Sequence, residues 1–507
     1  MTRQEEGSIR SSGWSILLIL SCLGLVVMFD ETMILPAIPD FIREFNISYS
    51  TSSWLLSAYI IAAAVMTPIG GKLSDIYGRK KILLIIMTVY AVGLMAGRFA
   101  TNMEFMIVAR VAQGVGLAMF PIAFSIIREV IPEKKLAVGQ TIFSSTFSGG
   151  AVIGLVGGAF IIQNFGWQAT FLAILPVTIA LWAIIVKFVP TSSQISISEG
   201  IETSKSSSSS SCSSSNNNNR TVDIKGTVAL ASIIITFLAG ISLMEGNGGD
   251  DRTTAATFQV APLFAASAVS LAAFIAIEKR VSSPLLDFKI MTSKSFLLPT
   301  IILMLVFMSI FMVYLTVPVM IRSPEPFGFG GNAITVASVQ LPFMTVLLIG
   351  TITSGFILNR VKNTKIMLLG TVISTIGFFV LLDFHSTENM ISIGLTILAS
   401  GLALSISGGF NIILLSVPMQ VTGIALGMTL LLNLIGMSLG PALSGAFQEA
   451  YKGTTPGLAG FFPTDHAYSL IFVTSALVSL ASVVMAISVL RVKIRTETMV
   501  SNNKSET

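Results

Sequence analysis

Residues 70–81, with the sequence GGKLSDIYGRKK, connect two apolar segments, 52–69 and 82–99. The loop holds four basic residues and one acid, whereas the segments beside it are almost free of charge. The hydrocarbon core of a bilayer needs about 20 mostly apolar residues per helix, and Lys and Arg gather in the short loops that face the cytoplasm. This stretch therefore predicts two transmembrane helices joined by a tight cytoplasmic turn.

The whole chain has the same apolar character. Of its 507 residues, 53% are hydrophobic and only 11% are charged, and the mean hydropathy is +0.84. Soluble domains carry about 25% charged residues, so this composition excludes soluble enzymes, disordered tails and DNA-binding modules. The net charge of +5 is not gathered in a basic stripe, and we expect no nucleic-acid partner. The two cysteines, Cys22 and Cys212, are too few for a disulfide framework.

Fourteen apolar runs are long enough to cross a membrane, and we expect the first to be an uncleaved span. With the N-terminus in the cytoplasm, 24 of the 30 Lys and Arg residues fall in cytoplasmic segments, 5 fall outside, and Arg110 lies within a span. This asymmetry predicts a multi-pass plasma-membrane protein with both termini in the cytoplasm. The predicted spans are 13–35, 52–69, 82–99, 105–127, 136–162, 168–188, 226–243, 257–277, 296–321, 333–358, 366–382, 390–416, 422–447 and 467–490.

We expect these spans to form an all-α membrane protein with two six-helix bundles and two inserted helices. A Ser/Asn-rich segment after the sixth span cannot bury enough apolar surface to fold, which predicts a disordered cytoplasmic linker. The predicted parts are an N-terminal bundle, this linker, the inserted pair with its connecting cytoplasmic segment, a C-terminal bundle and a cytoplasmic tail. They cover residues 1–190, 191–224, 225–295, 296–491 and 492–507.

An internal repeat supports this division. The loop at 70–81 has a degraded echo, GFILNRVK, at 355–362, and the glycine-rich segment 150–158 of the fifth span corresponds to 436–445 in the thirteenth. Two facing bundles are the plan of many secondary transporters, with the substrate cavity between them. Small residues and Pro in the glycine-rich segments predict close helix contacts or kinks. The positions expected to make them are Gly150, Gly154, Gly158, Gly440 and Pro441.

Asp30 and Glu31 are the only acids well inside a span, and a carboxylate in the membrane usually has a functional role. They lie about 100° apart on a helix, and we favour Asp30 over Glu31 as the residue that faces the cavity. Arg110 lies at a similar depth, about 9 Å from the outer end of its span, and is the predicted partner of Asp30. Two alternatives stay open: the first helix ends near Phe29 and both acids cap it, or Arg110 snorkels to the headgroups.

The loop at 70–81 is also a candidate conformational latch, because its glycines permit close helix approach and its acid can pair with a base or a helix N-terminus. The residues expected to form the latch are Gly71, Asp75, Gly78 and Arg79. The sequence contains no Cys/His cluster, phosphate-cradling loop or Ser-His-Asp constellation. We therefore expect no enzymatic activity, no metal, no cofactor and no ATP-driven pumping.

The motifs together resemble the major facilitator superfamily and, within it, the fourteen-span drug:proton antiporter family. Residues 71–80 are similar to the loop signature of the superfamily, and Asp30-Glu31-Thr32 followed by Pro36 is similar to the first-span motif of fourteen-span exporters. Residues 110–116, RVAQGVG, resemble the fourth-span motif associated with proton coupling, and residues 284–288, PLLDF, resemble a segment before the ninth span. The resemblance implies roles in proton coupling or substrate binding for four residues. They are Asp30, Glu31, Arg110 and Gln113.

Two positions depart from the family pattern. Leu155 follows Gly154 where the antiporter motif has Pro, which puts the helix kink and strict antiport coupling in question. Asn359 stands in the later loop echo where an acid is expected. Gly440-Pro441 retains the glycine-proline pair in the second half of the chain.

The sequence thus predicts a monomeric exporter, driven by the proton motive force, that works by alternating access. Its expected partners are small hydrophobic or cationic substrates, protons and the lipid bilayer. One alternative is a proton-coupled carrier of a single metabolite. The other is a non-transporting membrane sensor or scaffold whose Ser/Asn linker recruits a partner.

Overall fold

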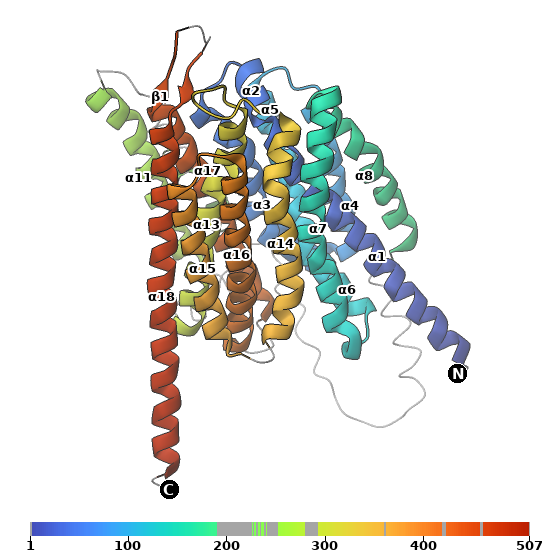
Figure 1. Ribbon diagram of the computed structural model, residues 1–507. Coiled ribbons are helices and arrows are strands. Elements are labelled where there is room, and N and C mark those ends of the chain that lie inside the picture. The colour runs from blue at the N-terminus through green and yellow to red at the C-terminus, as the bar shows by residue number, and fades with distance from the viewer. Residues whose placement is uncertain are drawn as a thin grey trace.

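A computed structural model gives the architecture of the chain. It describes residues 3–189, isolated positions between 226 and 240, and residues 252–278, 293–358, 361–417, 422–456 and 460–505. Long helices run side by side, and both termini lie at the same end of the molecule, opposite α2 and the small strand β1 (Figure 1). We call the end that carries α2 and β1 the α2 end. The charge distribution predicts that this end faces outward.

The first bundle contains eight α-helices and two short 3₁₀ turns within residues 3–188. Their bounds are α1 Arg3–Met33, η1 Leu35–Ala37, α2 Ile38–Glu44, α3 Tyr49–Tyr77, α4 Arg79–Arg98, α5 Met103–Gly114, η2 Val115–Ala118, α6 Met119–Val130, α7 Glu133–Phe165 and α8 Gln168–Phe188.

The second bundle contains six described helices and a small antiparallel hairpin. Each strand of the hairpin has two residues, and Lys452 pairs with Pro463. The last helix continues through the segment predicted to be a tail. The elements are α13 Lys294–Arg322, α14 Ala333–Leu358, α15 Asn363–Asp383, α16 Glu388–Ser416, α17 Thr422–Ala450, β1 Lys452–Gly453, β2 Phe462–Pro463 and α18 Asp465–Ser505.

Within the described residues, twelve helices are long and apolar enough to cross a membrane, and they match predicted spans one to six and nine to fourteen. The predicted eighth span coincides with α11, Arg252–Glu278, whose described apolar part is Ala261–Ile277. The predicted seventh span, the linker, Asn359 and residues 284–288 fall largely or wholly outside the described residues.

The inserted pair has one described contact. The Ser267 hydroxyl donates to the Ile233 carbonyl at 3.2 Å, so α11 contacts the seventh-span region. The count of fourteen stays a prediction.

The glycine-rich segments make the same helix contact in each bundle. In the first, a Cβ added at Gly150 would lie 2.6 Å from the Leu25 carbonyl oxygen of α1. In the second, a Cβ at Gly440 would lie 2.6 Å from the Met308 carbonyl oxygen of α13. Each fifth span therefore packs on the first span of its own bundle at van der Waals limits. Helix α7 runs without interruption past the fully buried Leu155.

The fourth predicted span, 105–127, is not one continuous helix. Helix α5 ends at Gly114, a 3₁₀ turn covers Val115–Ala118, and α6 follows from Met119. Gly114 packs directly against the Tyr59 carbonyl group of α3, where any Cβ would clash. A short 3₁₀ turn often marks a place where packing distorts a helix, and here it follows the motif that contains Arg110.

Candidate functional site

The site begins in α1, which continues as a regular helix to Met33. The Thr32 hydroxyl donates to the Met28 carbonyl at 3.2 Å and to the Ala151 carbonyl of α7 at 3.0 Å. Asp30 is completely buried and Glu31 is 8% exposed. The helix therefore does not end near Phe29, and both acids lie inside the protein rather than at its surface.

Arg110 of α5 points into the first bundle and is completely buried. Its Nη1 lies 3.7 Å from Asp30 Oδ2, which confirms the predicted pairing of these two charges across the bundle. Its Nε donates to the Leu55 carbonyl at 2.9 Å, and its Cζ lies 4.3 Å from the centre of the Tyr59 ring. The guanidinium is thus held by α3 and does not reach toward lipid headgroups.

Gln113 orients Arg110 from one turn away on the same helix. Its Oε1 accepts a 2.7 Å hydrogen bond from Arg110 Nη1, and its Nε2 donates to the Gly93 carbonyl of α4 at 2.9 Å. A Cβ on Gly93 would lie 2.8 Å from the Gln113 nitrogen, so glycine allows α4 and α5 to approach this closely. Three helices therefore fix the direction of one guanidinium.

The Asp30–Arg110 pair is incompletely satisfied. Neither Asp30 oxygen accepts a hydrogen bond, and Arg110 Nη2 and the Tyr90 hydroxyl also lack partners. Charge-assisted hydrogen bonds are about 2.7–2.9 Å long, so a separation of 3.7 Å leaves the pair short of its strongest geometry. Buried charges without full pairing carry a large desolvation cost. A proton on Asp30, or a small shift of α1 against α5, would change how far the attraction between the two charges offsets this desolvation cost.

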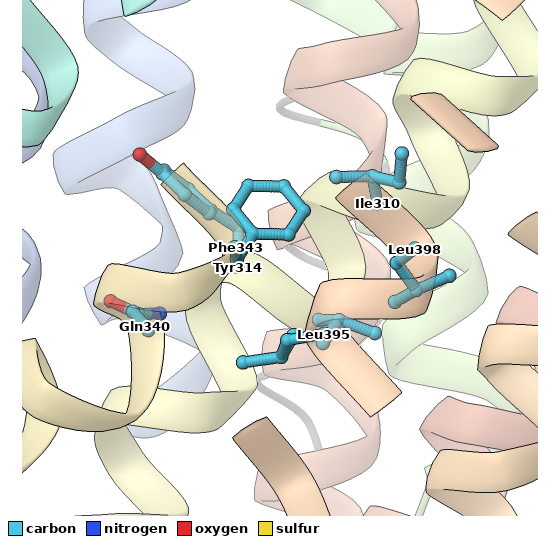
Figure 2. Close-up of a pocket in the computed structure, with 7 residues that line it drawn as sticks. Ile310, Tyr314, Gln340, Phe343, Leu395 and Leu398 are labelled. Carbon is cyan, nitrogen blue, oxygen red and sulfur yellow. The ribbon is translucent and has the colours of Figure 1, made fainter. Parts of the chain in front are cut away.

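Glu31, the next residue of α1, is also buried and also interacts electrostatically with Arg110. It lies close enough to the Tyr314 hydroxyl of α13 for the two groups to interact electrostatically. Figure 2 shows the Tyr314 hydroxyl pointing away from Ile310 and Leu398, toward a pale blue helix of the first bundle. Glu31 therefore interacts electrostatically with a residue of each bundle, Arg110 in the first and Tyr314 in the second.

The loop at 70–81 makes described contacts inside the first bundle. Gly78 has φ +95°, a conformation that favours glycine. Arg79 forms an ion pair with Glu129 and donates to the Ser125 carbonyl at 3.2 Å, both on α6. A Cβ at Gly71 would meet open space. The Asp75 side chain lies outside the described part of the chain, so its role in the latch stays a prediction.

A second charged cluster, at the α2 end, was missed by the sequence analysis. Arg322, at the end of α13, binds Asp40 of α2 with both nitrogens, at 2.5 and 2.7 Å, and donates to the Pro36 carbonyl at 2.7 Å. Arg43 also donates to Asp40 at 2.5 Å, from an exposed position. The available signal was that Arg322 and Arg43 are among the few basic residues on the side predicted to face outward.

Further hydrogen bonds join the two bundles near the same end. The Tyr49 backbone N–H donates to Glu449 Oε2 at 3.0 Å, and the Tyr49 hydroxyl donates to the Phe461 carbonyl at 3.3 Å. Deeper in the interface, the Ser57 hydroxyl donates to the Ser438 carbonyl at 3.0 Å. Helices α3 and α17 are also in extensive contact. The α2 end is therefore closed in this structure.

The site offers charge, hydrogen bonds and apolar contact. Within the described residues, no group of three or more His, Cys, Asp or Glu is arranged to hold a metal ion. What the buried pair can do is exchange a proton and respond to helix movement, since its charges are unevenly paired. The buried carboxylates of Asp30 and Glu31 can attract a cation.

Comparison with known proteins places these features in a family context. The Major Facilitator Superfamily sequence model matches residues 20–441. The chain is 23% identical over 431 residues to "Multidrug resistance protein 3" of Bacillus subtilis (strain 168), covering 84% of this chain and 77% of that protein. It is 24% identical over 462 residues to "Multidrug efflux pump LfrA" of Mycolicibacterium smegmatis, covering 89% and 84%.

A solved structure shares the fold. The structure described as the partially occluded inward open conformation of the xylose transporter XylE from E. coli aligns with a TM-score of 0.58. The alignment covers 93% of this chain and 97% of that chain at 14% sequence identity. A similarity at this level of identity concerns the arrangement of the helices alone.

Proposed function

Because the chain belongs to the Major Facilitator Superfamily, we propose that it exports hydrophobic or cationic small molecules across the plasma membrane in exchange for protons. It is a multi-pass membrane transporter and not an enzyme. The names of its relatives, which refer to multidrug resistance and efflux, support the choice of substrate class. The support for proton exchange is the buried Asp30–Arg110 pair of the site.

The observation that carries this proposal is the buried Asp30–Arg110 pair, 3.7 Å apart in the first bundle. When Asp30 is ionised, its charge balances Arg110 and adds to the negative potential at Glu31, which favours a bound cation. When Asp30 gains a proton, that contribution disappears and the neighbouring guanidinium disfavours the cation. Proton entry is thereby linked to substrate release, because the two protonation states differ in their affinity for the substrate.

Alternating access supplies the direction of transport. With the α2 end closed by Arg322–Asp40 and Tyr49–Glu449, the interface between the bundles would open toward the opposite end, where we expect substrate to be collected from the cytoplasm. Release outside then requires these contacts to separate. The bundles would rock about the central site as in other transporters built from two halves.

The test measures accumulation of a fluorescent lipophilic cation in cells that lack their own exporters, with and without a protonophore. We expect the parent protein to lower accumulation and the protonophore to abolish that effect. Asp30→Asn removes the proton site and should reduce proton-driven export about tenfold or more, since coupling between two binding sites typically changes affinity by about 5–150-fold. Arg110→Ala should also reduce proton-driven export.

Matched control variants are Asp383→Asn and Arg98→Ala, which change the same residue types at the outer ends of α15 and α4. Both should export like the parent. If Asp30→Asn and Arg110→Ala reach the membrane and export as well as these controls, the proposed coupling is wrong. If the parent moves one metabolite but no lipophilic cation, the protein is a carrier of that single metabolite and the proposal of multidrug export is wrong.

A further inference from the structure

The separation of Asp30 and Arg110 is larger than their charges alone would favour. Both side chains are completely buried, and yet Arg110 Nη1 stays 3.7 Å from Asp30 Oδ2. A direct charge-assisted hydrogen bond would be about 2.7–2.9 Å long. Neither Asp30 oxygen accepts a hydrogen bond, so the pair would gain from a closer approach. The contacts that Arg110 makes elsewhere therefore hold its guanidinium back from the acid.

One of these contacts is with the aromatic ring of Tyr59 on α3. Tyr59 is fully buried, and Arg110 Cζ lies over its ring, 4.3 Å from the centre. A cation within about 6 Å of a ring centre is attracted by the negative potential of the ring face, most strongly where water is excluded. The Leu55 carbonyl, one turn earlier on α3, accepts from Arg110 Nε at 2.9 Å. One face of α3 thus competes with Asp30 for the same cation.

Tyr59 is itself fixed by the two helices that carry the charged pair. Gly114 of α5 packs directly against the Tyr59 carbonyl group, where any Cβ would clash. The Tyr59 hydroxyl donates to the Val27 carbonyl of α1 at 3.4 Å, three residues before Asp30. The ring is therefore held between the helix of Arg110 and the helix of Asp30, where it can set the distance between them.

Resting on the proton-coupled export argued above, we propose that Tyr59 is a positioning residue that holds Arg110 away from Asp30 and so keeps Asp30 able to take up a proton. A guanidinium in direct contact would stabilise the ionised carboxylate and oppose its protonation. The attraction of the ring face for the cation does not depend on a proton. Arg110 can therefore keep its position in both protonation states of Asp30.

Other ionisable side chains interact with this pair. Glu31 of α1 and Tyr90 of α4 each interact electrostatically with both Asp30 and Arg110. From α13, Tyr314 interacts with Glu31. Tyrosine ordinarily ionises at about pH 10, so Glu31 is the member of this group whose protonation can overlap with that of Asp30. For this reason Glu31→Gln is the background for every titration described below.

Protonation of Asp30 is measured by infrared spectroscopy on the purified full-length protein in lipid nanodiscs. A carboxylic acid has a C=O stretching band that a carboxylate lacks, and the part of this band that Asp30→Asn removes belongs to Asp30. Tyr59→Leu takes away the ring face, so Arg110 should close on Asp30 and lower the midpoint of the titration by about one pH unit, a tenfold change in proton affinity. Tyr59→Phe keeps the ring and should titrate like the background. Tyr468→Leu removes a similarly buried tyrosine from α18 and, as the matched control, should leave the midpoint unchanged.

Fluorinated phenylalanines at position 59 separate the electrostatics of the ring from its size, and they keep the test available if Tyr59→Leu does not fold. Fluorine weakens the negative potential of the ring face with little change in shape. The midpoint should therefore fall with each added fluorine, starting from Tyr59→Phe. If the fluorinated series and Tyr59→Leu titrate like Tyr59→Phe, the ring does not hold Arg110 back and the inference is wrong.

The infrared titration needs no substrate, so this inference and the proposed function can fail separately. In the export assay, Tyr59→Leu should move the pH of half-maximal export to a lower value, whereas a purely structural role would reduce export equally at every pH. If the titrations shift as expected but the parent exports no lipophilic cation, the role of Tyr59 stands and the proposed function is wrong. If export is proton-driven but the midpoint is the same with and without the ring, export stands and the role of Tyr59 is wrong.

Discussion

Besides its ion pair with Asp30, the guanidinium of Arg110 makes three contacts whose geometry no other basic side chain could reproduce. It donates through Nε to Leu55 and through Nη1 to Gln113, while its plane lies near the Tyr59 ring. Lysine would keep the positive charge beside Asp30 but presents a single ammonium that cannot match this planar arrangement. The role of Arg110 therefore depends on shape as well as on charge.

This argument predicts the behaviour of Arg110→Lys. The ammonium can balance Asp30 but leaves the Leu55 carbonyl or Gln113 Oε1 without its donor, which amounts to a loss of about 1–3 kcal/mol. We expect substrate-dependent proton movement in proteoliposomes to fall about tenfold, while the variant still folds. Arg98→Lys, at the C-terminal end of α4, should behave like the parent. Equal proton movement in the two variants would show that charge alone is sufficient at position 110.

At the scale of the helices, the glycines of α7 determine how close it comes to the part of α1 that bears both acids. Gly150, Gly154 and Gly158 lie four residues apart on one face of α7 and contact α1 between Leu25 and Met33. This spacing lets two helices approach until backbone meets backbone. The position of Asp30 and Glu31 within the bundle is thus set by residues on a neighbouring helix that carry no charge.

Two neighbouring glycines of α7 give a matched test of this contact. A Cβ at Gly150 would lie 2.6 Å from both the Leu25 carbonyl oxygen and Met28 Cβ, whereas a Cβ at Gly149 meets nothing within 4 Å. Overpacking of this kind costs about 1–3 kcal/mol, so Gly150→Ala should lower the unfolding temperature in detergent. Gly149→Ala should be neutral or stabilising by up to about 1 kcal/mol because Ala favours the helix. Identical melting of the two variants would rule out close packing of α7 on α1.

The sequence was most informative where a property is local to one helix. Apolar length located the twelve described spans, and depth along the helix paired Asp30 with Arg110. Depth does not reveal which way a side chain faces, because that depends on where the neighbouring helices pack. Asp30 lies 3.7 Å from Arg110 within its own bundle, and which of the two acids faces the cavity stays a prediction. The interruption of the fourth span likewise follows Gly114, which packs against the carbonyl group of Tyr59 in another helix.

At the scale of the whole molecule, the relation between the two bundles was beyond the reach of sequence patterns. Asp40 lies in a seven-residue helix after the first span, and Arg322 lies 282 positions away along the chain. No periodicity or spacing links two such residues. Their contact exists because the bundles close at the α2 end, so it reports a conformation of the transporter and not a property of either segment.

The Asp40–Arg322 contact should therefore control how often the α2 end opens. The two side chains are only 20% and 12% exposed and form two parallel hydrogen bonds, a geometry that makes an ion pair comparatively strong. Arg322→Gln should raise the open population about tenfold, which corresponds to about 1.4 kcal/mol. A cysteine at Ser57, whose hydroxyl is buried against Ser438 in the closed state, reports opening. With Cys22 and Cys212 replaced by serine, a membrane-impermeant maleimide added outside cells should label Ser57→Cys about tenfold faster when Arg322→Gln is present.

The control for this measurement is Arg43→Gln. Arg43 also binds Asp40, but it lies on the same short helix, and its side chain is 70% exposed. Its removal takes away a charge and a hydrogen bond from Asp40 without separating the bundles, and exposed ion pairs contribute little. Labelling should then remain at the rate of the parent. If Arg43→Gln and Arg322→Gln accelerate labelling equally, the effect comes from the charge of the surface, and the bond between the bundles does not hold the α2 end closed.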